Sequence, residues 1–403
     1  MLNAPHSIDI ASARAETGIG DSLAYLNNAR LSPCPTPVLQ AIKEALENEH
    51  RGLWGDDQAG SVVRNLKTSL AELINSKPEE IAITQCASYS FNTIINGLSW
   101  HKGDNVVVYD LAYRTIPQVL MRLRDEKEVE LRFVETEDLL IDPAAVIAAV
   151  DDRTRLVIVD HLPVFCGVPQ PIAEIGKLLA DTPALFCINA TQSTGQLPAD
   201  VKEFRCDFLF GTSRKWLRGP RGLGFLYVRQ PLIAGMRPTN LGYPYTKWVD
   251  LDKYEIADSV ERLEMGDYPY ALMVGLTESI RYAQRIGIGK IKERNQTLGQ
   301  LCRQTLSQIP HVQLYDLKTG KTGTVPFNIR GMDATVAVKL LQDEGIATCF
   351  LNEEAALRGL RKLNQPRVVR AALHYFNTED EIEQLSQALT SIGKHSSAAS
   401  RSQ

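Results

Sequence analysis

Short apolar runs alternate with segments of helical periodicity from about residue 60 to residue 228, and this alternation restricts the possible folds more than any other feature. The runs that we expect to form strands lie at residues 80–84, 105–109, 131–134, 156–160, 185–188, 208–210 and 224–228. Apolar residues at helical spacing occupy residues 62–74, 116–124, a stretch near 144, and 171–180. Strands separated by helices in this way predict an α/β fold with a doubly wound, mostly parallel sheet.

A second, smaller unit follows a break in this rhythm at residues 242–248. We expect a long helix over 271–286, then strands at 324–329, 347–350 and 367–372 with helices at 334–344 and 379–389. We therefore divide the chain into a large α/β domain at 30–260 and a small α+β domain formed by 1–29 and 261–393. The polar tail at 394–403 is predicted to be disordered.

The charge balance and the hydropathy pattern exclude two classes of partner. The 44 Lys and Arg residues are matched by 48 Asp and Glu residues, and the resulting net charge of −4 argues against a nucleic-acid surface. No window approaches about 18 uninterrupted apolar residues, and residues 1–14 lack the apolar segment of a secretory signal. We expect no nucleic-acid partner, no membrane partner and a cytoplasmic location.

The cysteines and histidines do not indicate a metal site. The seven cysteines are odd in number and scattered, none of them forms a C-x-x-C pair, and the seven histidines are also dispersed. We therefore expect neither a bound metal nor a disulfide framework.

Polar clusters follow five of the predicted strands at the point where each strand ends. They lie at residues 85–88, 112–114, 161–167, 189–192 and 211–215. Because open α/β sheets bind ligands at the carboxyl ends of their strands, the five clusters predict one site along a single edge of the sheet.

Lys215 is the sharpest candidate within these clusters. It lies between the apolar strand 208–210 and Trp216, beside the cation of Arg214. Burial and a neighbouring cation both lower the pKa of a lysine, as an amine that forms a Schiff base requires. The hydroxyl of Thr212, the guanidinium of Arg214 and the backbone N–H groups where Ala87 and Ser88 open a helix could hold a phosphate nearby.

Residues 212–228 resemble the lysine segment of the class V aminotransferase family, whose members have fold type I and depend on pyridoxal 5′-phosphate. The branch that this segment most resembles contains hercynylcysteine sulfoxide lyases and isopenicillin N epimerase-like proteins. Weaker matches occur in the family's order at 26–29, 160–161, 192–196 and 369–378. The similarity extends from about residue 20 to residue 390.

The resemblance implies a role for each matching residue. Lys215 would form the Schiff base with the cofactor and move protons. The remaining implied contacts are with the cofactor phosphate (Ala87, Ser88, Thr212 and Arg214), its phenolic oxygen (Gln192), its ring face (Tyr113), its pyridine nitrogen (Asn189) and the amino-acid substrate (Arg370 and Asn28). The family also implies a homodimer.

Two departures from the family pattern concern chemistry. Asn189 stands where the family has an aspartate against the pyridine nitrogen, and an uncharged amide stabilises a protonated ring nitrogen less than a carboxylate does. We therefore expect that nitrogen to be neutral for a larger share of the time; the alternative is that Asn189 is tolerated and a nearby group or a water molecule takes over. Cysteine desulfurases carry a nucleophilic cysteine before the carboxylate-binding arginine; residues 351–356 contain none, and Cys349 lies in a predicted strand, which argues against persulfide chemistry.

The favoured interpretation is an enzyme that binds pyridoxal phosphate and breaks a bond at Cβ of an amino acid, of the C–S type as its resemblance to the lyase branch implies. An aminotransferase or epimerase on the same scaffold is the alternative. A protein that keeps the fold for binding alone is a third possibility, against which the joint presence of Lys215, Arg214, Gln192 and Arg370 argues.

Overall fold

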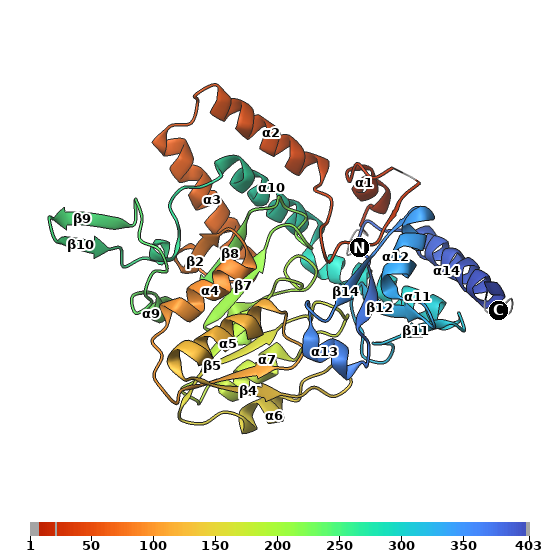
Figure 1. The fold of residues 1–403 in the computed structure, drawn as a ribbon. Helices are drawn as coiled ribbons and strands as arrows, with labels where there is room; N and C mark the ends of the chain where they lie inside the picture. The colour runs from red at the N-terminus through yellow and green to blue at the C-terminus, as the bar shows by residue number, and fades with distance from the viewer. Residues whose placement is uncertain (1–7, 21, 400–403) are drawn as a thin grey trace, which may run out of the picture.

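The computed structural model describes residues 8–20 and 22–399, with side chains described up to residue 393. A large α/β unit and a smaller C-terminal unit lie side by side in Figure 1, each with its own hydrophobic core. The predicted α/β fold class is confirmed.

The large unit is built on a seven-stranded sheet with the order β2-β8-β7-β6-β5-β3-β4. Its strands are β2 (Ile81–Thr84), β3 (Asn105–Tyr109), β4 (Glu130–Val134), β5 (Thr154–Asp160), β6 (Leu185–Asn189), β7 (Phe208–Thr212) and β8 (Gly224–Val228). β8 runs antiparallel to β2 and β7, and the other pairings, from β4 through β7, are parallel. Apolar and β-branched residues are buried along the central strands, as expected of a sheet covered on both faces.

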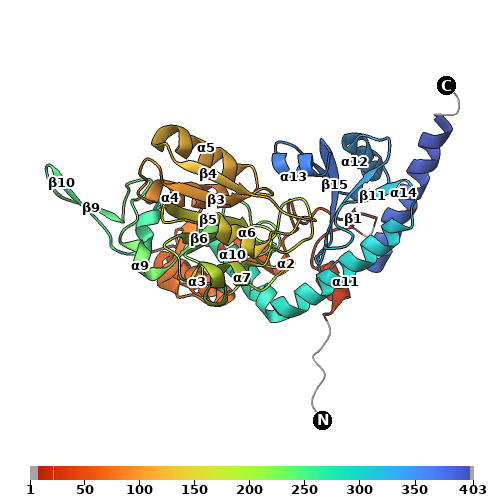
Figure 2. The same ribbon diagram turned by 90° about the horizontal axis from the view of Figure 1, so that it is seen from below.

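Helices cover both faces of this sheet (Figure 2). One face carries α4 (Ala87–Gly97) and α5 (Thr115–Lys127), and the other carries α2 (Thr36–His50), α3 (Asp56–Ile74), α6 (Pro143–Ala148), α7 (Ile172–Leu179), α8 (Val201–Phe204) and α10 (Tyr270–Ile286). The short helix α9 (Gln230–Ile233) follows β8. This arrangement is the doubly wound sheet predicted from the alternation of strands and helices.

The smaller unit has a four-stranded antiparallel sheet with the order β11-β12-β15-β14. Its strands are β11 (Val312–Leu314), β12 (Thr324–Ile329), β14 (Cys349–Asn352) and β15 (Arg367–Ala372). Its helices are α11 (Ile288–Ser307), α12 (Ala334–Asp343), α13 (Leu357–Lys362) and α14 (Glu379–Ala399). The N-terminal segment joins this unit, since β1 (Ala24–Tyr25) pairs in parallel with β13 (Ile346–Ala347), and α1 (Ile10–Ala15) precedes β1.

The small domain was expected to resume at residue 261. The two hydrophobic cores place the boundary between the units further along the chain. Met273, Leu276 and Ile280 of α10 belong to the core of the large unit, and α10 packs against α2 and α3. The core of the small unit contains Ala24 and Leu26 from the N-terminal segment and resumes with Leu298 of α11. The apolar face of α10 therefore completes the large unit, and α11 leads into the small one.

The C-terminal segment also differs from its prediction. α14 continues to Ala399, so most of the tail that was expected to be disordered from residue 394 is helical; residues 400–403 lie outside the described part of the chain. Acidic residues at 379–381 open this helix, where negative charge interacts favourably with the helix dipole.

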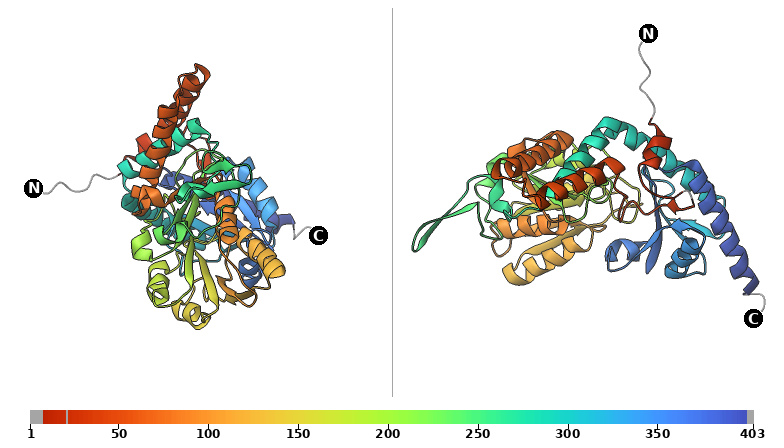
Figure 3. Two further views of the ribbon diagram at one scale, coloured as in Figure 1. Left: turned by 90° about the vertical axis from the view of Figure 1, so that its left-hand side faces the viewer. Right: turned by 90° about the horizontal axis from the view of Figure 1, so that it is seen from above.

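A two-stranded hairpin extends from the large unit on the side away from the small unit (Figure 3). It consists of β9 (Thr246–Asp250) and β10 (Lys253–Ile256), and it carries the exposed side chains of Trp248, Leu251 and Tyr254. None of the described helices is long and apolar enough to cross a membrane.

Candidate active site

Neighbouring strands of the large sheet end in polar side chains at one edge. Asp160 is the last residue of β5, Asn189 the last of β6 and Thr212 the last of β7, and Lys215 follows in the next turn. The register of β5 and β6 pairs Asp160 directly with Asn189. This edge, at the carboxyl ends of parallel strands, is where open α/β sheets bind their ligands.

The small unit contacts this edge through the loop that follows β5. Arg370 on β15 donates a hydrogen bond from Nη1 to the carbonyl of Val164. The carboxylate of Asp316 accepts from the N–H of Gly167 at 2.8 Å and is held by Arg303 at 2.9 and 2.7 Å. Loop 164–167 is thus fixed between the two units, and Arg370 reaches the edge of the large sheet.

Lys215 is a buried amine that lacks a counter-ion in contact. Its side chain makes no hydrogen bond or ion pair within residues 8–20 and 22–393, although the residue is only 9% exposed. Burial, together with the charges of Arg214 and Arg370, holds the pKa of Lys215 well below its ordinary value, while Asp160 opposes the shift. A neutral amine of this kind is the form that attacks a carbonyl carbon.

Asp160 and Asn189 form a buried polar pair beside this amine. Asn189 donates from Nδ2 to Oδ1 of Asp160 at 2.9 Å, and its own Oδ1 accepts from the N–H of Thr191 at 3.1 Å. Oδ2 of Asp160 accepts from the N–H of Tyr113 at 3.3 Å. Burial raises the pKa of Asp160 to about 7, against the opposing effects of these hydrogen bonds, the Tyr109 hydroxyl and the Lys215 charge.

Gln192 and Tyr113 lie next to this pair. The amide of Gln192 donates from Nε2 to the carbonyl of Ala29 at 3.1 Å and accepts from the indole N–H of Trp216 at 2.9 Å. One of its two amide protons therefore stays available to a ligand. Tyr113 is half-buried, and its backbone bond to Asp160 holds it over the end of β5.

The first turn of α4 presents backbone donors at the same end of the sheet. No side chain caps this helix at Cys86, and the hydroxyl of Ser88 lies 3.2 Å from that of Thr115. The helix begins close against β8: a Cβ at Gly224 would come within 2.9 Å of the Cys86 backbone. The N–H groups of Ala87 and Ser88 at a helix start suit an anion such as a phosphate.

The two phosphate candidates at the end of β7 and just after it, Thr212 and Arg214, have other partners in the structure. Thr212 donates its hydroxyl proton to the carbonyl of Leu223 at 3.2 Å, and Arg214 donates from Nη1 to the carbonyl of Arg30. A hydroxyl has a single proton to donate, so Thr212 could bind a phosphate as a donor only after its hydroxyl turns. Arg214 keeps further N–H groups for an anion.

Arg370 is a buried guanidinium with donors to spare. It is 2% exposed, Nη2 lies 3.4 Å from Sγ of Cys349, and Nε has no partner. In the part of the chain with described side chains it forms no ion pair. A buried cation without a carboxylate partner is costly, and a bound carboxylate would satisfy it.

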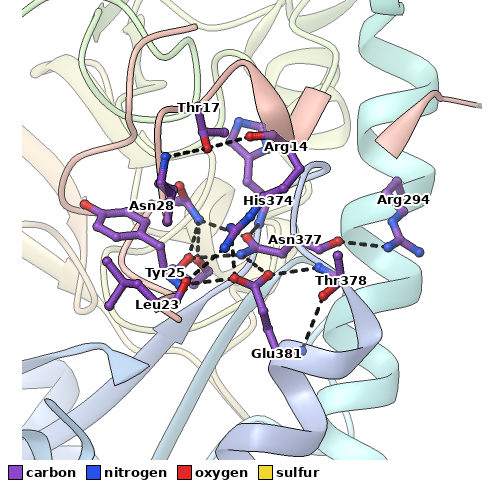
Figure 4. Close-up of polar contacts among 12 residues, drawn as sticks. Arg14, Thr17, Leu23, Tyr25, Asn28, Arg294, His374, Asn377, Thr378 and Glu381 are labelled. Carbon is purple, nitrogen blue, oxygen red and sulfur yellow. Dashed lines mark hydrogen bonds and ion pairs between the residues drawn. The ribbon is translucent and has the colours of Figure 1, made fainter. Parts of the chain in front are cut away.

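Asn28, for which the resemblance implies a substrate contact, has several partners within the fold. Figure 4 shows its side chain within a polar network that joins the N-terminal segment to the start of α14. Nδ2 donates to the Ala372 carbonyl at 2.8 Å and to Oδ1 of Asn377 at 3.2 Å, and Oδ1 accepts from Ser32 at 3.0 Å. Asn377 in turn donates to Glu381 at 2.7 Å. With its amide used in this way, Asn28 stabilises the fold.

Asp160 is the polar residue of the site to which sequence reasoning assigned no role. The sequence signal was present, because a carboxylate at the end of an otherwise apolar strand is expensive to bury without a purpose. Its contact with Asn189 depends on the pairing of β5 with β6, which no local pattern specifies.

The charges of this edge suit a ligand that carries a phosphate and a carboxylate. Arg214 and Arg370 supply cations, the α4 amides supply donors, and Lys215 supplies an amine whose pKa is held well below its ordinary value by burial and the neighbouring arginines. Pyridoxal phosphate, which has an aldehyde and a phosphate, fits these residues, and an amino acid supplies the carboxylate. Among the described residues no group of three or more His, Cys, Asp and Glu side chains could hold a metal ion.

Comparisons with known proteins agree with this chemistry. The family model described as aminotransferase class-V matches residues 24–385. A probable cysteine desulfurase of Methanothermobacter thermautotrophicus is 32% identical over 91% of this chain and 94% of its own length. A cysteine desulfurase of Salmonella agona is 27% identical over 93% and 94%. The apo structure of a cysteine desulfurase from Thermococcus onnurineus superposes with a TM-score of 0.91 at 28% identity, covering 97% of this chain and 99% of that one.

The fold and the site together define a pyridoxal-phosphate-dependent enzyme of fold type I. The chain belongs to the class V aminotransferase family, because the family model covers most of its length. The predictions of family, fold class, cofactor and enzymatic character are confirmed. The roles of individual site residues stay predictions.

We predict that Asp160→Asn changes how the stability of the cofactor-free protein depends on pH. The pKa of Asp160 rises from 3.8 to about 7 on folding, so between these values the folded protein keeps a proton that the unfolded chain releases. The free energy of unfolding should therefore fall as pH rises through this window, by at most about 1.4 kcal/mol per pH unit. The variant should lack this contribution, as urea unfolding at pH 5 and pH 8 would show. Parallel pH profiles of the two proteins would contradict the prediction.

Proposed function

We propose that this chain is a lyase that breaks the C–S bond at Cβ of a cysteine-like amino acid, with release of a thiol, ammonia and pyruvate. The observation that carries the proposal is the pairing of Lys215, a buried neutral amine, with Arg370, a buried cation without a carboxylate partner. The relatives named cysteine desulfurases, and a cystine C–S lyase that shares the fold at 24% identity, support chemistry on a sulfur-bearing amino acid.

The proposed cofactor contacts use the residues gathered at the strand ends. Lys215 would hold the cofactor covalently, and the N–H groups of Ala87 and Ser88 with Arg214 would bind its phosphate. When bound, pyridoxal phosphate supplies the electron sink for bond cleavage next to Cα. The ring would pack against Tyr113 and meet Gln192 and Asn189 with its polar atoms, and Thr212 would join the phosphate contacts after its hydroxyl turns.

Arg370 would orient the substrate by its α-carboxylate. Its guanidinium is fixed by the Val164 carbonyl and lies close enough to Lys215 to affect its pKa, so a carboxylate held there keeps Cα near Nζ. Nζ of Lys215 would take the Cα proton of the substrate and deliver it to the departing sulfur. With the thiol lost from Cβ, addition of one water molecule would balance the release of pyruvate and ammonia.

The absence of a loop cysteine favours a lyase over a persulfide-forming desulfurase. In the structure, residues 353–356 form the turn between β14 and α13 and include no cysteine. Cys349 is the nearest thiol along the chain, but it is buried in β14 with Sγ beside Arg370. An aminotransferase or an epimerase on the same scaffold is the alternative outcome.

We predict that purified protein incubated with L-cysteine or L-cystine forms pyruvate and ammonia in equal amounts, together with sulfide or persulfide. Cys349→Ser should give the same product ratio, since the proposed reaction does not transfer sulfur to the enzyme. Alanine in place of pyruvate, lost in the Cys349→Ser variant, would indicate a desulfurase. An aminated cofactor with a keto acid that retains sulfur would indicate an aminotransferase, and the D-amino acid an epimerase.

We predict that borohydride reduction of the cofactor-loaded protein attaches the cofactor to Lys215. Lys67 is a matched internal control, because it is also buried but its ammonium is held by Glu261 and Glu264 at 2.6 and 2.9 Å. Peptide mapping should find the label on Lys215 and none on Lys67. A label on another lysine, or loading that survives in Lys215→Ala with the same absorption spectrum, would overturn the assignment.

We predict that Arg370→Ala weakens amino-acid binding by roughly tenfold or more, the equivalent of about 1.5–3 kcal/mol for hydrogen bonds to a charged group. Cofactor loading should stay intact. Arg367→Ala is the matched control, since Arg367 lies on the same strand but pairs with Asp333 at 2.8 Å in a half-exposed position. Spectral titration with cysteine measures both variants; equal affinities would assign the carboxylate to another residue.

We also propose a homodimer in the cytoplasm. The exposed Trp248, Leu251 and Tyr254 of the β9–β10 hairpin support a second copy as their partner, because isolated two-stranded hairpins with exposed aromatic side chains are marginally stable. The cysteines are all unpaired thiols, five of them buried, which suits a reducing compartment.

A further inference from the structure

The carboxylate of Asp160 occupies the strand end next to the one where the family has its aspartate. Asn189 stands at the family's position on β6, and Asp160 ends β5 directly opposite it in the register. The two side chains are joined by the 2.9 Å hydrogen bond from Asn189 Nδ2 to Asp160 Oδ1. The negative charge that position 189 lacks is thus present one strand away.

Within the described residues, Asp160 is hydrogen-bonded only by neutral groups, so its negative charge would be available to a bound cationic ligand. It is 1% exposed, and its oxygens accept hydrogen bonds from neutral groups, the amide of Asn189 and the N–H of Tyr113. It forms no ion pair with any residue whose side chain is described. By contrast, Asp110 at the end of the adjacent β3 is paired with Lys362 at 2.5 Å. The amine of Lys215 acts on Asp160 only from outside contact distance.

The amide of Asn189 can serve either charge state of a pyridine nitrogen. Nδ2 has a second proton that could be donated to a neutral nitrogen, and Oδ1 has a second lone pair that could accept from a protonated one. The amide of Asn189 therefore does not determine the protonation state of the pyridine nitrogen by itself. The carboxylate of Asp160 would determine it, because a buried charge acts strongly over a short distance in a low dielectric.

We infer that Asp160, acting through Asn189, supplies the negative charge that keeps the ring nitrogen of the bound cofactor protonated. This inference rests on the proposed binding of the cofactor at Lys215. It favours the alternative that a nearby group takes over the role of the missing aspartate, in place of the expectation that the ring nitrogen is neutral for a larger share of the time. Asp160 is a positioning and charge-supplying residue that Asn189 connects to the ring.

The electrostatics of the pair agree with this role. Without a ligand, burial raises the pKa of Asp160 to about 7, so near neutral pH the carboxyl group lies close to its midpoint. A cation that arrives nearby lowers the pKa of a carboxylic acid and so favours its ionised form. Charge on Asp160 and charge on the ring nitrogen would then stabilise one another.

The experiment compares two cofactors in the cofactor-free protein. One is pyridoxal phosphate with ¹⁵N in the ring, whose protonated and neutral forms give well-separated resonances. The other is an analogue in which carbon replaces the ring nitrogen. The ¹⁵N resonance and the ratio of the two affinities report on the charge at the ring without any turnover.

Two variants separate charge from structure. Asp160→Asn removes the charge. The double variant Asp160→Asn/Asn189→Asp moves it to β6 and conserves the hydrogen bonds, because the new carboxylate can accept from both Thr191 and the amide at position 160, whose oxygen accepts from Tyr113. Asp207→Asn is a control for loss of a buried carboxylate at the opposite edge of the sheet, where Asp207 precedes β7 and binds Phe186 N–H at 2.8 Å.

We expect the parent protein to show a protonated ring nitrogen and to bind pyridoxal phosphate at least about tenfold more tightly than the analogue, the equivalent of one pKa unit. Asp160→Asn should show a neutral nitrogen and nearly equal affinities, and the double variant should regain both properties. Asp207→Asn should behave as the parent. A protonated nitrogen and an unchanged ratio in folded Asp160→Asn would overturn the inference. Failure of the parent to bind the cofactor at Lys215 would instead overturn the proposed function.

Discussion

The hydrogen bond between Asn189 and Asp160 joins the ends of two central strands at the edge where the candidate site lies. Parallel strands bring the two side chains together at a buried edge, where polar groups must find partners or cost free energy. Each satisfies the other, and the N–H of Tyr113 completes the set. The pair therefore fixes the loop after β3 and leaves the amine of Lys215 without a competing carboxylate in contact.

The site is complete only because the small unit reaches this edge. Arg370 contacts the loop after β5, and the pair formed by Arg303 and Asp316 holds that loop by its Gly167 N–H. Next to Arg370 on the same strand, the carbonyl of Ala372 binds Asn28, whose network with Asn377 anchors the N-terminal segment. Arg370 is held by the Val164 carbonyl and the Cys349 thiol, which are both uncharged, so its positive charge is not neutralised within the described part of the chain. Asp160 likewise forms no ion pair with a residue whose side chain is described.

Local patterns in the sequence were enough to predict the large sheet and the position of Lys215. The strands of that sheet are apolar runs whose burial does not depend on distant detail, and the apolar flanks of Lys215 forecast its own burial. Residues whose partners come from elsewhere in the chain were not predictable in this way. Asn28 matches a family motif, but its amide binds Asn377. Asp160 has a partner at the site only because β5 pairs with β6, which carries Asn189. Helix α10 belongs to the core of the large unit because it packs against α2 and α3.

The presence of a carboxylate at Asp160 changes which reaction can be inferred from the asparagine at position 189. If the ring nitrogen were neutral, a weak electron sink would itself favour rapid expulsion of a leaving group over transamination. If Asp160 keeps the ring nitrogen protonated through Asn189, the charge of the ring does not favour elimination over transamination. The residues around Cβ of the substrate must then determine which reaction occurs. There Arg370 is fixed by the backbone carbonyl of Val164, in a loop whose Val164 and Phe165 side chains are buried. Selectivity for C–S cleavage would then rest on Lys215, whose buried amine can take the Cα proton and then deliver that proton to the departing sulfur.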